Sequence, residues 1–181
     1  MVPAVALTGT PGTGKSAVAR ALGRSVRSIE VAELARRLGA ARRRGRATIV
    51  DLPALVRRVR RERSLATYDL VVGHLAHLLP VQEAIVLRCR PVELAERLAR
   101  ARRGSTRERR DNVVCEATDL ILIEAVAAGR TVFEIDTTGR PVAAVARAVR
   151  ARLRRPGEAR TGTVDWLGDD GVTEHLLDRG R

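Results

Sequence analysis

Short apolar runs alternate with amphipathic stretches along most of this 181-residue chain. The apolar runs have the length of buried strands, whereas the stretches between them repeat apolar residues every three or four positions, as helices do. Strands are therefore expected at residues 4–7, 28–31, 47–50, 69–72, 84–87 and 131–135. Helices are expected at residues 16–22, 32–38, 91–102, 105–128 and 141–154, and from Asp51 onward, where a capping aspartate precedes a proline in the first turn.

Strands that alternate with helices indicate a parallel sheet covered by helices on both faces. We therefore predict an α/β fold with a five-stranded parallel sheet, formed as one domain by residues 1–155. A basic, glycine-containing loop is expected at residues 39–46, and a glycine-rich tail follows at residues 156–181. This tail packs on the domain or extends from it, and its one apolar anchor is the segment 164–167.

The eight residues GTPGTGKS, Gly9 to Ser16, match the phosphate-binding motif G-x-x-x-x-G-K-[ST] in full, between an expected strand and an expected helix. Glycines in such a loop adopt positive φ and let backbone N–H groups close around phosphate oxygens. Lys15 would place a mobile point charge between the β- and γ-phosphates, and the Ser16 hydroxyl would bind Mg²⁺. The sequence therefore predicts binding of ATP or GTP with magnesium. A guanine-reading N-K-x-D motif would need a second lysine, which disfavours GTP.

Charge adds a second observation. The 34 Lys and Arg residues outnumber the 21 Asp and Glu residues, which gives a formal net charge of +13, and Lys15 is the only lysine. Such an excess of positive charge is typical of proteins that contact RNA or ribosomes. Arginine spread over solvated helix faces by a GC-rich genome is the alternative explanation. No apolar run is long enough to span a bilayer and no signal segment is recognisable, so we expect a cytoplasmic protein without membrane contact.

Two basic segments are candidates for the parts that turn nucleotide binding into phosphoryl transfer. A kinase needs a site for the acceptor and a mobile basic segment over the transferring group. The first is residues 30–53, an irregular stretch that carries Arg36, Arg37 and Arg42 to Arg44. The second is residues 100–110, which join two helices through Gly104. A solvated basic loop is the alternative for each segment.

Five segments, with GTVDWL near the end of the chain, carry a family resemblance. They are TGTPGTGKS (8–16), VVGHLAHLLP (71–80), AIVLRCRP (84–91), NVVCEATDLILIEA (112–125) and VFEIDTTGR (132–140). Together they resemble the isoenzyme-6-type adenylate kinases. The resemblance implies the P-loop fold of a nucleoside-monophosphate kinase, the reaction ATP + AMP = 2 ADP with Mg²⁺, and ATPase activity. It also implies a role in maturation of the small ribosomal subunit, with contacts to a ribosomal protein or rRNA. We expect a monomer or a weak dimer.

The resemblance also assigns residues to sites. It places Arg36 and Asp51 at the monophosphate, in a segment of about 30–53, and Arg103 in a lid of about 102–112 that reaches ATP. Lys15, Arg103 and His74 are the expected catalytic residues. The residues expected around the ATP phosphates are Gly12, Gly14, Lys15, Ser16, Ala17 and Arg103, with Ser16 on the metal.

One departure concerns the end of the strand at 69–72. The family pattern has an acidic residue two positions before His74, where this chain has Val72. A carboxylate there would hold Mg²⁺-bound water, and Asp69 is three residues too far from the strand end to replace it. His74 has two readings: it orients a water or phosphate oxygen, or it closes the strand by a hydrogen bond.

Two rival functions remain open from the sequence. The first is a nucleotide-switched assembly factor that binds RNA or ribosomes and has little kinase turnover, favoured by the net charge and by Val72. The second is a small-metabolite kinase on the same scaffold.

Overall fold

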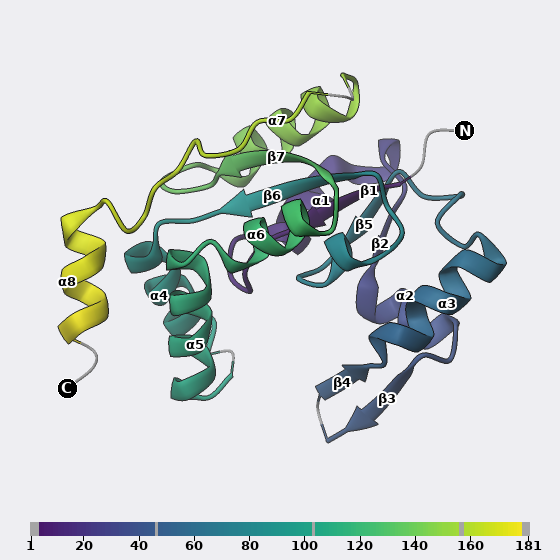
Figure 1. The fold of residues 1–181 in the computed structure, drawn as a ribbon, viewed down its shortest axis with the longest axis horizontal. Helices are drawn as coiled ribbons and strands as arrows, with labels where there is room; N and C mark the ends of the chain where they lie inside the picture. The colour runs from purple at the N-terminus through teal and green to yellow at the C-terminus, as the bar shows by residue number, and fades with distance from the viewer. Residues whose placement is uncertain (1–3, 46, 103, 156–157, 179–181) are drawn as a thin grey trace.

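The computed structural model describes residues 4–45, 47–102, 104–155 and 158–178. Five parallel strands form its central sheet, in the order β2-β5-β1-β6-β7 (Figure 1). Their bounds are β1 Val5–Thr8, β2 Ser28–Glu30, β5 Leu70–Val72, β6 Glu83–Arg88 and β7 Thr131–Asp136. The predicted α/β fold with a five-stranded parallel sheet is confirmed.

Helices cover both faces of this sheet. The helices are α1 Lys15–Leu22, α2 Val31–Arg37, α3 Leu52–Glu62, α4 Pro91–Arg100, α5 Thr106–Ala117, α6 Leu120–Ala127, α7 Val142–Leu153 and α8 Asp170–Asp178, with short 3-10 turns η1 Gly23–Ser25 and η2 Ala76–Leu78. Apolar residues of α1 and α7 pack on one face, and those of α2, α3 and α6 pack on the other. None of the helices in the described ranges is long and apolar enough to cross a membrane.

The strand expected at 47–50 forms, but outside the main sheet. It is β4 (Ala47–Val50), which pairs antiparallel with β3 (Ala41–Arg44) in a separate hairpin that projects from the sheet (Figure 1). The prediction of a loop at 39–46 is therefore partly wrong, because residues 41–44 form β3. The β3 arginines are exposed, so this strand lacks the apolar alternation by which a half-buried strand is recognised in a sequence.

The prediction of one long helix at 105–128 is also wrong, because this segment forms two helices, α5 and α6. Asp119 lies between the two helices with a φ of 56°, in the left-handed region. Its carboxylate accepts a hydrogen bond from the guanidinium of Arg88 on β6. This long-range ion pair accompanies the break, and the local sequence around Asp119 contains no glycine or proline that would predict it.

The tail packs on the domain. Arg160 exchanges backbone hydrogen bonds with Val132 and Glu134 and so extends the edge of β7. Trp166 is buried against Ala117 of α5, as expected of the apolar anchor, and α8 follows it.

Candidate active site

The motif at 9–16 forms a tight loop between the end of β1 and the start of α1. Gly9 and Gly14 have φ values of 133° and 98°, a region that side-chain-bearing residues rarely occupy. A Cβ atom on Gly9 would also lie 2.3 Å from the carbonyl oxygen of Leu87 on β6. The expected positive φ of these glycines is thus found. The loop places the N-terminus of α1, with its unpaired N–H groups and partial positive charge, over the carboxyl end of the sheet.

Lys15 folds back over the same loop. Its Nζ donates to the carbonyl oxygens of Gly9 (2.7 Å) and Thr10 (2.9 Å), and its side chain is only 9 % exposed. Burial lowers the pKa of Lys15 to about 8, an effect that the negative charges of Glu116 and Glu30 partly oppose. The partners of the ammonium among the described residues are two neutral carbonyl groups, so no direct ion pair within that part of the chain balances its charge, and a bound anion would stabilise it.

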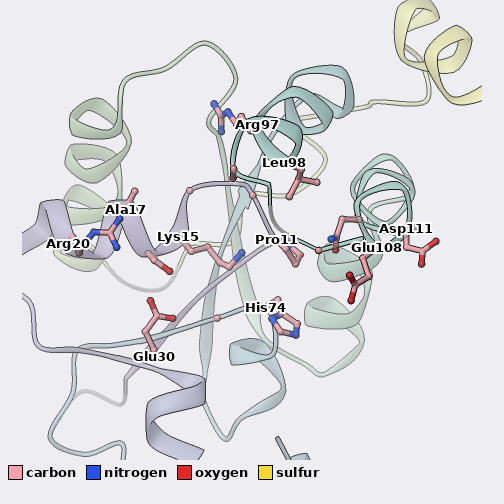
Figure 2. A pocket seen from close by; sticks show the side chains of 17 residues that line it. Pro11, Lys15, Ala17, Arg20, Glu30, His74, Arg97, Leu98, Glu108 and Asp111 are labelled. Carbon is pink, nitrogen blue, oxygen red and sulfur yellow. The ribbon is translucent and has the colours of Figure 1, made fainter. Parts of the chain in front are cut away.

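A cavity of about 710 Å³ opens beside the loop (Figure 2). Its walls come from the phosphate loop and α1, from the ends of β2 and β5, from α4, and from the start of α5. The lining residues are Pro11, Gly12, Gly14, Lys15, Ser16, Ala17, Arg20, Glu30, Gly73, His74, Arg97, Leu98, Ala101, Gly104, Glu108, Asp111 and Asn112. The volume is in the range of pockets that hold small ligands.

The structure brings six of the residues expected at the site to this one cavity. These are Gly12, Gly14, Lys15, Ser16, Ala17 and His74. Arg103 lies outside the described residues. Its neighbour Gly104, from the expected lid segment, does line the cavity.

The two residues expected at the monophosphate are absent from the described lining of the cavity. Arg36, on α2, is an exposed side chain that pairs with Glu33 one turn earlier. Asp51 caps α3, since its carboxylate accepts from the Ala54 N–H at 2.9 Å. The capping role that the sequence predicts for Asp51 is confirmed. In this conformation neither the Arg36 nor the Asp51 side chain faces the phosphate loop cavity.

The two histidines of the β5 to η2 turn have different surroundings. His74 faces the cavity, and partial burial together with the charge of Lys15 keeps its pKa below the ordinary value. His77 is completely buried, with ring nitrogens 3.0 Å from Thr8 Oγ1 and 3.2 Å from Glu124 Oε2. His77 is therefore structural, whereas His74 is available to a ligand in its neutral form at pH 7.

Sequence reasoning missed several charged residues of the cavity. Arg20 lies one helical turn after Ser16, so its position on α1 could have been found from the i, i+4 spacing. Glu30 ends a strand of the parallel sheet, which is also a recognisable signal. Glu108 and Asp111 lie on α5 inside the expected lid segment of about 102–112, although neither residue was singled out, whereas only the packing of α4 brings Arg97 to the cavity.

A buried polar network supports the loop from behind. The Glu116 carboxylate on α5 accepts hydrogen bonds from Thr10 Oγ1 (2.5 Å), Arg88 Nε (2.9 Å), the Cys89 N–H (3.0 Å) and Trp166 Nε1 (3.3 Å). One carboxylate of α5 thus joins the phosphate loop, the end of β6 and the tail.

The lowered pKa of Lys15 predicts that nucleotide binding takes up a proton. A bound phosphate favours the ammonium and raises the pKa, so at about pH 8 the half-deprotonated free protein should bind about 0.5 proton per nucleotide, rising toward one near pH 9. Nucleotide affinity should accordingly fall as pH rises through about 8. Calorimetry in buffers of different ionisation enthalpy measures the uptake. A Lys15→Ala protein that takes up the same number of protons would contradict this assignment.

Comparison with known proteins agrees with this geometry. A family model described as an AAA domain matches residues 5–119. A protein of Archaeoglobus fulgidus named "Putative adenylate kinase" is 40 % identical over 171 residues, covering 91 % of this chain and 92 % of the relative. One of the same name from Thermococcus onnurineus is 35 % identical and covers 96 % and 97 %.

Among solved structures, a gluconokinase from Sinorhizobium meliloti 1021 is 17 % identical, with a TM-score of 0.47 over 84 % of this chain and 92 % of that one. At that score it adds nothing to the fold described above. The sequence relatives are decisive, because their identity extends over nearly the whole length of both chains. This chain therefore belongs to the family of these archaeal proteins named "Putative adenylate kinase", which confirms the resemblance inferred from its motifs.

Proposed function

We propose that this protein is a broad-specificity nucleoside-monophosphate kinase that catalyses ATP + AMP = 2 ADP, with ATPase activity in addition. The observation that carries the proposal is the joining of a complete phosphate loop and the start of the lid segment in one cavity of about 710 Å³. The names of the relatives support adenylate kinase activity. We further propose that it acts in the cytoplasm as a monomer or weak dimer.

In this proposal the phosphate loop and Lys15 bind the phosphates and stabilise the transition state. Lys15 exchanges its two carbonyl partners for phosphate oxygens and neutralises charge on the transferring group, while the N–H groups at the start of α1 bind the other oxygens. Arg103 would close over the transferring group with the lid, residues 102–112. A general base is unnecessary, because the AMP phosphate is already an anionic nucleophile.

Magnesium fits the donor chemistry of the cavity. The Ser16 hydroxyl is an oxygen donor beside Lys15, and Mg²⁺ prefers oxygen ligands and retains several waters. When bound with ATP, the ion supplies charge neutralisation on the phosphates. Ser16 would hold it, and His74 would orient a water or a phosphate oxygen at the mouth of the cavity.

We propose that the arm formed by α2, β3, β4 and α3 provides the monophosphate site. Arg36 and Asp51 sit on this arm, within the segment of about 30–53. Because neither faces the cavity in the described conformation, monophosphate binding would require the arm to close toward the phosphate loop, a substrate-induced closure of the kind known for loops and domains of enzymes.

The direct test is ADP formation from ATP and Mg²⁺ at low protein concentration, with and without AMP. We expect AMP to accelerate ADP formation sharply, with two ADP formed per ATP consumed. If ADP instead accumulates at one slow rate regardless of AMP, the protein is an ATPase. If other phosphate acceptors work and nucleoside monophosphates do not, it is a small-metabolite kinase.

A second candidate function is favoured by the charge of the projecting hairpin. Arg42, Arg43 and Arg44 are consecutive and exposed on β3, in a chain of net charge +13. Such a basic projection suits contact with phosphate backbones, so we also propose a role in small ribosomal subunit maturation through rRNA or a ribosomal protein. Association with small-subunit particles that weakens steeply with salt would support it.

A further inference from the structure

The carboxyl edge of the sheet contains a row of three in-register residues. Leu7 of β1 pairs with Val72 of β5, and Val72 pairs with Glu30 of β2. Residues in register on parallel strands point to the same face, and both Leu7 and Val72 belong to the core on the α1 side. Ile29, the neighbour of Glu30, belongs to the core on the opposite face. The Glu30 side chain therefore points to the face on which α1 begins.

Glu30 also opens into the phosphate loop cavity. Its side chain lines the cavity together with Lys15 and Ser16, and Figure 2 shows it pointing from the end of β2 toward the segment that carries Lys15. Its negative charge acts on the Lys15 ammonium. Within the part of the chain that the structure describes, the Glu30 carboxylate has no hydrogen bond or ion pair, although Glu30 occupies the N-cap position of α2.

Val72 stands between Glu30 and β1, and it is only 1 % exposed and apolar. It therefore contributes no oxygen to the cavity. Adjacent strands lie about 4.8 Å apart, so the carboxylate of Glu30 starts one strand further from the loop than a carboxylate at Val72 would. The extra distance suits contact through a water, and Mg²⁺ retains several waters when it binds with nucleotide phosphates.

We propose that Glu30 holds the Mg²⁺-bound water that a carboxylate at Val72 would otherwise hold, so the acidic support of the metal has moved one strand outward in the sheet. The inference rests on the proposed Mg-ATP function. Glu30 is a positioning residue, which acts on the metal through water and takes no part in proton transfer.

The other carboxylates of the cavity are placed less well for this role. Glu108 is engaged in the capping box of α5, where its Oε2 accepts from the Ser105 N–H at 2.5 Å. Asp111 lies one turn further along α5, and both residues lie across the cavity from Glu30 in Figure 2. Asp111 is thus the residue to test against Glu30.

The experiment measures metal dependence without turnover. Affinity for a non-hydrolysable ATP analogue is determined by calorimetry in excess EDTA and in Mg²⁺, for the wild-type protein and for Glu30→Gln. The gain in affinity from Mg²⁺ should be about tenfold smaller in Glu30→Gln, because partners that orient metal ligands contribute that much or more to metal affinity. The metal-free affinity should stay equal or rise, because a negative charge near the phosphates is removed.

One matched variant serves as the control. Glu62→Gln removes an exposed carboxylate that pairs with Arg61 at the end of α3, outside the described cavity lining, and should keep the wild-type gain. Asp111→Asn is the competing variant, because Asp111 also lines the cavity, and it should lose less of the gain than Glu30→Gln.

The proposal is overturned if Glu30→Gln keeps the full gain in affinity from Mg²⁺, or if Asp111→Asn loses that gain instead. It is also overturned if Glu30→Gln weakens binding in EDTA as much as binding in Mg²⁺, because such a uniform loss indicates a merely structural role. A wild-type protein that binds no nucleotide would contradict the proposed function itself. Wild-type binding that is insensitive to Mg²⁺ would refute the role of Glu30 alone.

Discussion

Lys15→Ala is expected to lower kcat/KM for AMP-dependent ADP formation by at least about 10²–10³-fold, the loss typical when one group that stabilises transition-state charge is removed from a preorganised site. Lys15 is the cation of the phosphate loop, and its Nζ donates to the carbonyl oxygens of Gly9 at 2.7 Å and Thr10 at 2.9 Å. Coupled detection of ADP measures the rate.

The melting temperature of Lys15→Ala shows whether a lower rate reflects lost catalysis or lost folding. Burial lowers the pKa of Lys15, so the folded protein below about pH 8 carries a charged group at a cost in stability, and alanine removes that cost. The melting temperature of Lys15→Ala should therefore not fall. Arg24→Ala, which removes an exposed cation in η1, should leave both rate and stability close to wild type. A Lys15→Ala enzyme with wild-type kcat/KM would rule out the proposed mechanism.

The largest expected effect on stability belongs to Arg88→Ala. Arg88 is 1 % exposed, and its guanidinium binds Glu116 at 2.9 Å, Glu134 at 2.5 Å and Asp119. Removing the cation leaves buried carboxylates without a partner, which costs about 3–5 kcal/mol in comparable cases. Urea unfolding of the wild-type and variant proteins measures the difference.

Arg100→Ala is the matched control for that experiment. Arg100 pairs with Glu96 on the surface of α4, where the two side chains are 76 % and 59 % exposed. Exposed pairs of this kind contribute about 0–1 kcal/mol, so the control should unfold close to wild type. Equal free energies of unfolding for Arg88→Ala and Arg100→Ala would mean that the buried network contributes no more than a surface ion pair.

Local patterns in the sequence determined the class of fold and the phosphate loop. The five strands of the sheet and helix α1 follow from periodicity, and the phosphate loop follows from the motif GTPGTGKS. These signals depend on neighbouring residues only. Where the local signal was weak or misleading, as in the exposed β3 strand and at the break before α6, the prediction was wrong.

Only the tertiary structure decided which charged residues meet at the site. Thr10 and Glu116 are 106 residues apart yet share a hydrogen bond of 2.5 Å, and Arg88 collects carboxylates from three elements. The in-register pairing of Glu30 with Val72 likewise depends on the order of strands in the sheet. Such contacts arise when separate apolar faces pack together, and a charged residue carries no mark in its own sequence neighbourhood of the partner that packing will bring to it.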